Sequence, residues 1–224
     1  MQIDILTLFP KMIQGFLDES IIKRAQNNKI VNINIYDLRH WTTDRHHTVD
    51  DAPYGGGAGM ILKVDVIDKA LYYLKLKANG HASQKQIAIL LTPQGKRFTQ
   101  QIAKKLAKIN HLILICGHYG GFDERIRKLV DMEISLGDFV LTGGEIPAVA
   151  LSDAIIRLLP STINKESLIN ETHSKKGAKQ YPLYTRPENY TPVSKNLKNL
   201  SVPEVLKSGN HKDIENWRDK NMKN

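Results

Sequence analysis

Three short glycine-containing stretches carry the residues best suited to binding a small molecule. They occupy residues 92–95, 117–121 and 137–144, and each follows a run of apolar residues. Ligands of open α/β sheets bind beyond the carboxyl ends of the strands, where glycine lets backbone amides approach them closely. Ordinary turn formation would explain Gly95 alone, but it explains the long stretch from Gly137 poorly. The three stretches together predict a ligand pocket at one edge of a sheet.

A fourth polar stretch, at residues 44–51, concentrates carboxylate and imidazole groups. Its members are Asp44, His46, His47, Asp50 and Asp51. Such groups can bind metal ions, but neighbouring ligands on one loop lack a defined metal-binding spacing, so we expect no metal. Unpaired surface histidines are common, and a solvated loop is the alternative interpretation of His46 and His47.

Two common nucleotide-binding motifs and two kinds of cysteine site are excluded. No Gly-x-x-x-x-Gly-Lys-Ser/Thr motif occurs, so ATP or GTP hydrolysis is not expected. Residues 55–59 are rich in glycine, but a polar segment precedes them where a dinucleotide fingerprint needs a buried strand. Cys116 is the single cysteine, which rules out an internal disulfide and a thiolate zinc site. We interpret it as a small buried hydrophobe at a strand end.

Composition indicates a globular protein with an anionic partner. The 224 residues are 41% hydrophobic, enough for one domain with a substantial core and an appendage. The formal net charge is +9, and residues 161–224 hold 12 Lys and Arg against 7 Asp and Glu. This basic tail favours nucleic acid as a partner, although a solvated surface has the same composition. No apolar run of membrane-spanning length and no signal-peptide pattern occurs, so we expect a cytoplasmic location without membrane association.

Apolar periodicity predicts an α/β fold for residues 1–160, which Pro160 ends. The three glycine-rich stretches follow predicted strands at residues 87–91, 112–116 and 132–136, and residues 37–59 are predicted to be a long loop. Strands and helices alternate, as they do around a parallel sheet. Further strands are predicted at residues 3–8 and 31–35, and helices at residues 10–22, 66–74, 99–109, 123–130 and 145–159.

The remaining residues predict a linker and a small second domain. Residues 161–180 have little periodicity and are predicted to be a flexible linker between domains. Residues 181–224 are predicted to form a small, basic, helical domain, with short helices at 202–206 and 213–218.

Five separated motifs resemble those of the bacterial tRNA (guanine-N1)-methyltransferase family in order and spacing. The match covers roughly residues 1–218, and family members usually continue with further helices, so the second domain is expected to be shortened. The resemblance implies that this small domain, residues 181–224, binds tRNA. The motifs lie at residues 44–60, 93–95, 116–125, 137–148 and 184–188.

The resemblance implies a fold, a reaction and an assembly. The fold is a knotted α/β methyltransferase of the SPOUT type, a parallel sheet with a deep trefoil knot, which is one of the rare exceptions to unknotted topology. The reaction moves a methyl group from S-adenosylmethionine to N1 of the guanosine 3′ to a tRNA anticodon. The assembly is an obligate homodimer in which both chains build each active site.

Residue by residue, the resemblance also assigns the binding sites. Residues 136–141 supply the apolar slot that an adenine ring needs, and a sulfonium needs no metal. Asp50 is expected to read a guanine edge, with His46 and Tyr54 also contacting RNA. The expected cofactor contacts are Leu91, Thr92, Pro93, Gly117, Tyr119, Gly121, Leu136, Gly137, Asp138, Phe139, Val140, Leu141, Gly143 and Gly144.

Methylation of guanine N1 needs a general base for its proton and a group that stabilises charge building on O6. Arg157 stands at the family's catalytic arginine position, although an arginine there could instead cap helix carbonyls. Counting without gaps from Pro160 to Pro187, the family's aspartate base falls on Thr172, which cannot take a proton near neutral pH.

Glu171, next to Thr172, is therefore the predicted base, with Glu166 or a solvated role for Glu171 as alternatives. Three further positions depart from the family pattern: His118 and Gly120 replace the usual Arg and Glu, and Gln180 replaces an acidic residue. The alternative function is a diverged relative that binds cofactor and tRNA without efficient turnover.

Overall fold

The structure is a computed structural model that describes residues 1–78, 85–164, 171–173, 180–193 and 199–222. Contacts along the chain group it into two compact units, Met1–Ile163 and Asn164–Asn224. The first unit holds all three glycine-rich stretches and the second holds the basic tail. Each unit is described by itself below.

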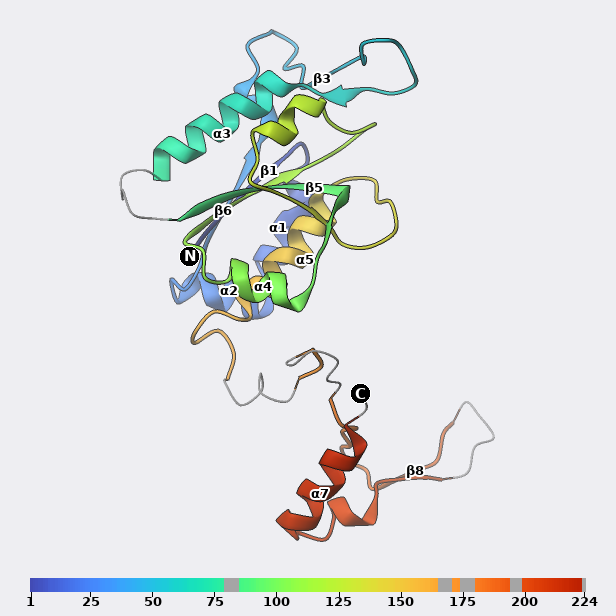
Figure 1. Ribbon diagram of the computed structural model, residues 1–224. Coiled ribbons are helices and arrows are strands. Elements are labelled where there is room, and N and C mark those ends of the chain that lie inside the picture. The colour runs from blue at the N-terminus through green and yellow to red at the C-terminus, as the bar shows by residue number, and fades with distance from the viewer. Residues whose placement is uncertain (79–84, 165–170, 174–179, 194–198, 223–224) are drawn as a thin grey trace. The chain divides into compact units, whose positions relative to one another are not determined.

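A five-stranded parallel sheet forms the centre of the first unit (Figure 1). The strand order is β2-β1-β6-β5-β7, and every neighbouring pair is parallel. The predicted α/β fold with a parallel sheet is thereby confirmed. The strands are β1 (Gln2–Thr7), β2 (Asn32–Asp37), β5 (Gln86–Arg97), β6 (His111–Cys116) and β7 (Met132–Ser135).

Helical elements cover both faces of this sheet, which explains why its central strands are almost wholly apolar. Side chains alternate between the faces, so Leu112 and Leu114 of β6 join one buried cluster while Ile113 and Ile115 join the other. On the first face lie α1 (Lys11–Leu17), α2 (Ser20–Asn27), α4 (Gln100–Leu106) and α5 (Glu145–Ile156), and on the second lie α3 (Val64–Ala78) and the 3₁₀ helices η1 (Leu38–Trp41) and η2 (Glu124–Lys128).

Two sequence-based predictions for the amino-terminal half need correction. The helix predicted at residues 10–22 is two helices, α1 and α2, because Glu19 is extended and Ser20 has a φ of 55°. The apolar stripe missed this break because its residues on both sides face the same core. The loop predicted at residues 37–59 contains η1 and the short strand β3 (Asp50–Asp51), which pairs with β4 (Ile61–Leu62).

Two further corrections concern segments close to the predicted pocket. Strand β5 does not end before residues 92–95; its ladder with β7 is interrupted between Leu91 and Lys96, which both pair with Ile134. The α-helix predicted at residues 123–130 is the shorter 3₁₀ helix η2. Its cap is Asp123, whose side chain accepts a hydrogen bond from the Arg125 backbone N–H at 2.9 Å.

The second unit contains the expected short helices and a small antiparallel sheet. The 3₁₀ helix η3 (Glu204–Leu206) and helix α7 (His211–Asn221) confirm the two predicted helical segments. Strands β8 (Asn189–Tyr190) and β9 (Leu200–Ser201) were not predicted, because two residues are too few to show an alternating pattern. Most of the predicted linker, residues 161–180, lies outside the described residues. None of the described helices is long and apolar enough to cross a membrane.

A buried polar cluster joins the amino-terminal ends of three strands. The fully buried Asp4 carboxylate lies 2.8 Å from Nε2 of the fully buried His111, and the Asn34 side-chain amide donates to its other oxygen at 2.7 Å. Removing one partner of a buried pair leaves the other without compensation.

We predict that Asp4→Ala lowers the free energy of unfolding by about 3–5 kcal/mol, because it leaves His111 and Asn34 without their shared acceptor. Urea denaturation measures this loss. The matched control is Asp18→Ala, which removes an exposed carboxylate and should change stability by less than about 0.5 kcal/mol. Equal losses in the two variants would contradict a structural role for the buried cluster.

Candidate functional site

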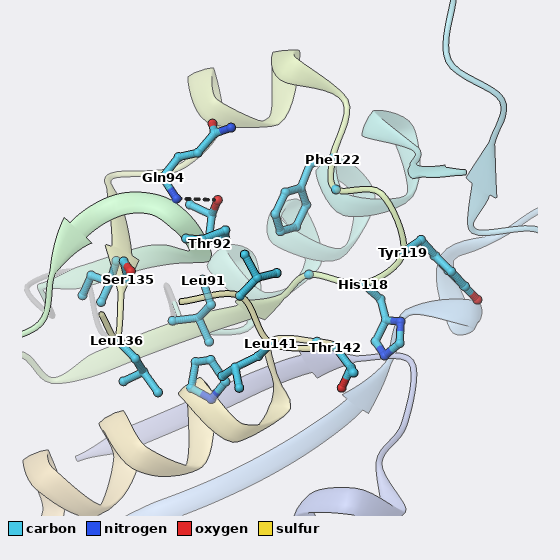
Figure 2. A pocket seen from close by; sticks show the side chains of 18 of the residues that line it. Leu91, Thr92, Gln94, His118, Tyr119, Phe122, Ser135, Leu136, Leu141 and Thr142 are labelled. Carbon is cyan, nitrogen blue, oxygen red and sulfur yellow. Dashed lines mark hydrogen bonds between the residues drawn. The ribbon is translucent and has the colours of Figure 1, made fainter. Parts of the chain in front are cut away.

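A cavity of about 280 Å³ opens beside the interrupted part of β5 and the stretches that follow β6 and β7 (Figure 2). Two of the residues that the resemblance assigns to the cofactor, Gly137 and Asp138, do not line this cavity. The cavity lies at the carboxyl ends of parallel strands, where α/β folds bind their ligands. Twelve of the residues assigned to the cofactor line it: Leu91, Thr92, Pro93, Gly117, Tyr119, Gly121, Leu136, Phe139, Val140, Leu141, Gly143 and Gly144.

The first wall is the interrupted part of β5, residues 92–95. The backbone N–H of Gln94 donates to Thr92 Oγ1 at 3.4 Å, which turns the chain out of the ladder (Figure 2). A Cβ atom on Gly95 would lie 2.5 Å from the backbone nitrogen of Ile134. Glycine is therefore needed at this position so that the segment can lie directly against β7.

The second wall, residues 117–121, is tied to strand β4 by backbone hydrogen bonds. The N–H of Gly120 donates to the Met60 carbonyl at 2.9 Å, and the N–H of Leu62 donates to the Gly121 carbonyl at 3.0 Å. Tyr119 has a φ of 58° and presents a half-exposed ring. These bonds couple the cavity to the polar loop that precedes β4.

The third wall, residues 137–144, is held at both of its ends. Ser135 Oγ donates to the Gly137 carbonyl at 2.9 Å, and the Gly144 N–H donates to the Gly117 carbonyl at 2.8 Å. Between these anchors the side chains of Phe139, Val140 and Leu141 are exposed. The wall thus offers apolar side chains and backbone groups, which suit a planar heterocycle.

A buried carboxylate lies directly behind this third wall. Thr7 Oγ1 donates to Glu145 Oε1 at 2.6 Å, while Glu145 Oε2 is buried and has no hydrogen-bond partner. A Cβ on Gly143 would lie 2.4 Å from that oxygen and 2.6 Å from the His118 ring. The sequence analysis assigned Glu145 no role. A carboxylate is favoured at the first turn of a helix, and the position of Glu145 at the start of α5 could have drawn attention to it.

Burial raises the pKa of the Cys116 thiol well above its usual value, and the charge of Glu145 adds to the effect. The thiol therefore stays protonated at neutral pH, and Cys116 is fully buried in the core. Its interpretation as a small buried hydrophobe is confirmed.

Comparison with known proteins supplies the family. The family model for tRNA (guanine-1)-methyltransferase TrmD matches residues 1–224. The chain belongs to this family. It is 50% identical to the tRNA (guanine-N(1)-)-methyltransferases of Carboxydothermus hydrogenoformans and of Bacillus subtilis, over 98% of this chain and 82% and 86% of the relatives. The enzyme of that name from Mycoplasmopsis synoviae is 48% identical over 97% of this chain and 90% of the relative.

The residues that the family resemblance assigns to RNA lie on the loop coupled to the second wall. Asp50 is half-buried in β3 opposite Leu62, whereas His46 and Tyr54 are exposed. Asp44 holds the loop together, since its carboxylate accepts from the Thr48 hydroxyl at 2.8 Å and from two backbone N–H groups.

Hydrogen bonding, chiefly from the Thr48 side chain, holds the pKa of Asp44 below its usual value. The neighbouring His47 is also engaged, because its Nδ1 lies 2.9 Å from the Thr42 hydroxyl. Asp44 and His47 therefore shape the loop. Within the described parts of the chain, no three His, Cys, Asp or Glu side chains gather as metal ligands.

The two predicted catalytic residues are not among the residues that line the cavity. Arg157 follows the last turn of α5, whereas Gly144 and Pro147 line the cavity at the first turn. Twelve helical residues separate these ends by about 18 Å at 1.5 Å per residue. Glu171 belongs to the second unit, where the neighbouring Thr172 Oγ1 accepts from the Gln180 N–H at 3.1 Å. The alternative base, Glu166, is outside the described residues.

The close approach of Gly95 to the backbone of β7 leads to a prediction about the stability of this chain. We predict that Gly95→Ala costs about 1–3 kcal/mol of stability, because its methyl group meets the β7 backbone, which cannot rotate away. The control is Gly15→Ala in α1, where a Cβ meets nothing within 4 Å and alanine favours the helix by about 0.5–1 kcal/mol. Urea unfolding of both variants checks the opposite signs, and a neutral Gly95→Ala would refute the close approach.

Proposed function

We propose that the chain transfers a methyl group from S-adenosylmethionine to N1 of the guanosine 3′ to a tRNA anticodon. The observation that carries the proposal is the cavity, which gathers twelve predicted cofactor residues from three separate segments of the chain. Identity of 50% to named methyltransferases over 98% of the chain favours an active enzyme over a relative that only binds.

The cavity residues fit an adenosyl group. Leu136, Phe139 and Leu141 supply apolar contact for an adenine ring, and the backbone of the three walls supplies hydrogen-bond donors and acceptors. When bound, S-adenosylmethionine supplies a methyl group activated by its sulfonium. The chain's own task is to hold that ligand in a fixed conformation, which the anchored walls favour by being formed in advance.

A trefoil knot of the SPOUT type is consistent with the path of the chain through the cavity. Strand β7 is at the edge of the sheet beside β5, yet the chain then returns to β6, where Gly144 bonds to Gly117. Helix α5 continues from there across the first face of the sheet. This return past the interrupted part of β5 supports threading of the chain through its own loops.

The proposed catalytic groups are Arg157 and Glu171. The Glu171 carboxylate takes the proton from guanine N1, and the Arg157 guanidinium stabilises negative charge on O6 as the new N–C bond forms. Arg157 lies about 15 Å along α5 from Pro147, a residue of that helix that lines the cavity of its own chain. We therefore propose a homodimer in which the partner chain completes each site.

Recognition of the RNA involves two regions in this proposal. The Asp50 carboxylate accepts hydrogen bonds from a guanine edge, and the exposed His46 and Tyr54 contact the same strand. Residues 181–224 add a basic surface for the phosphate backbone of the tRNA. A tRNA substrate implies that the protein works in the cytoplasm.

Labelled methyl transfer to an unmodified tRNA transcript with guanosine 3′ to the anticodon tests the reaction. We predict transfer by the wild type and its loss in Gly137→Val, whose added Cβ would lie 2.8 Å from the Phe139 ring and displace it into the cavity. Calorimetry should show that Gly137→Val no longer binds S-adenosylmethionine. A wild type that binds both ligands but transfers nothing would favour the binding relative instead.

Single-turnover kinetics test the two catalytic groups. We predict that Arg157→Ala and Glu171→Gln each slow methyl transfer by about 10²–10⁴ with little change in cofactor affinity, because neither residue is among those that line the cavity. Glu166→Gln tests the alternative base and should keep the wild-type rate if Glu171 is the base. Wild-type rates in Glu171→Gln would overturn the base assignment alone.

Mixing two inactive variants extends this test to the shared site. Heterodimers of Arg157→Ala and Gly137→Val chains contain one cofactor cavity whose partner supplies an intact Arg157. Activity should return in that mixture if the partner completes the site. It should stay absent if each chain uses its own arginine.

A further inference from the structure

The Arg127 side chain touches three segments that surround the cavity. Its Nε lies 2.9 Å from Glu124 Oε1, and its two terminal nitrogens contact Glu133 Oε2 and Gln94 Oε1. Only 25% of the side chain is exposed. Arg127, Gln94 and Glu124 also line the cavity itself. One guanidinium therefore joins η2, β7 and the interrupted part of β5.

The segment reached through Gln94 lacks the usual support of a strand. The β5 ladder with β6 ends at Leu91, and the ladder with β7 omits residues 92–95. Within the segment, the Gln94 N–H bonds to Thr92 Oγ1 at a long 3.4 Å. Two of its residues, Thr92 and Pro93, are among the predicted cofactor contacts. Its conformation depends on side-chain contacts such as the one from Arg127.

Guanidinium geometry suits this task better than a point charge does. The planar group presents donors in fixed directions, so it can contact Gln94 and Glu133 at the same time. Glu133 is anchored in β7 and Glu124 in η2, which gives Gln94 two fixed reference points. A wall held in its bound conformation beforehand costs less ordering entropy when the ligand arrives.

We infer that Arg127 is a positioning residue for the cofactor: through Gln94 it holds residues 92–95 as the wall against which the adenosyl ligand binds. This inference rests on the proposed use of S-adenosylmethionine. It assigns Arg127 no contact with the reacting atoms. Its effect is on cofactor affinity, and the chemical step is unchanged.

The central experiment compares Arg127→Gln with the matched control Lys128→Gln, which removes an exposed cation from the same 3₁₀ helix. Calorimetry should show S-adenosylmethionine binding about tenfold more weakly in Arg127→Gln and unchanged in Lys128→Gln. In methyl transfer, the KM for the cofactor should rise by a similar factor while kcat stays within about twofold. Arg127→Lys keeps the positive charge but lacks the planar guanidinium that contacts Gln94 and Glu133 together, so it should recover only part of the affinity.

A second ligand separates positioning from simple electrostatics. S-adenosylhomocysteine, the demethylated product, lacks the sulfonium charge. Loss of a preformed wall weakens both ligands by the same factor. Loss of a positive charge near the cavity would instead favour the cationic S-adenosylmethionine over its neutral-sulfur product. A changed ratio of the two affinities in Arg127→Gln would therefore overturn the positioning role.

Hydrogen exchange in the ligand-free protein keeps the inference independent of the cofactor assignment. Arg127→Gln and Gln94→Ala should both speed exchange across residues 92–97, and Lys128→Gln should not. A wild type that fails to bind S-adenosylmethionine would refute the proposed cofactor, while exchange would still decide whether Arg127 holds the wall. Unchanged exchange and unchanged affinities in a folded Arg127→Gln variant would overturn the inference.

Discussion

The cavity depends on one constraint, namely that three chain segments approach one another with no room for a side chain between them. A Cβ on Gly144 would lie 2.5 Å from the Cα of Cys116, and one on Gly95 would lie equally close to the backbone of Ile134. Backbone contact at these points brings the interrupted part of β5 against β7 and the stretch after β7 against the end of β6, and the cavity opens between these segments. The Arg127 guanidinium contacts Gln94 and Glu133 at the same cavity.

Buried polar side chains form hydrogen bonds toward both ends of strand β1. At its carboxyl end, Thr7 donates to the buried carboxylate of Glu145, directly behind the third wall. At its amino end, Asp4 joins β1 to β6 and β2 through His111 and Asn34. Losing one partner of such a buried pair costs much stability, because the other partner is left without compensation.

The positions of the functional groups suggest a division between binding and chemistry. The cavity is lined by residues of the first unit, whereas Arg157 follows the last turn of α5 and Glu171 belongs to the second unit. Guanine N1 must lose a proton at the moment it receives a methyl group, so base and cofactor have to meet around one substrate atom. A partner chain that brings its own α5 to the cavity would satisfy this need, and it is the reason for proposing a homodimer.

The sequence by itself determined where the strands lie along the chain: apolar runs marked β1, β2, β5, β6 and β7, and glycine-containing stretches next to three of these runs marked the cavity. Both signals are local, because a strand buried on two faces must be apolar and a close backbone approach requires glycine. Tertiary structure alone decided the interruption of β5 at residues 92–95, the break between α1 and α2, and the contacts of Glu145 and Arg127. These depend on partners distant in the sequence, such as Thr7 for Glu145 and Gln94 for Arg127, and no local pattern records which distant residue a side chain will meet.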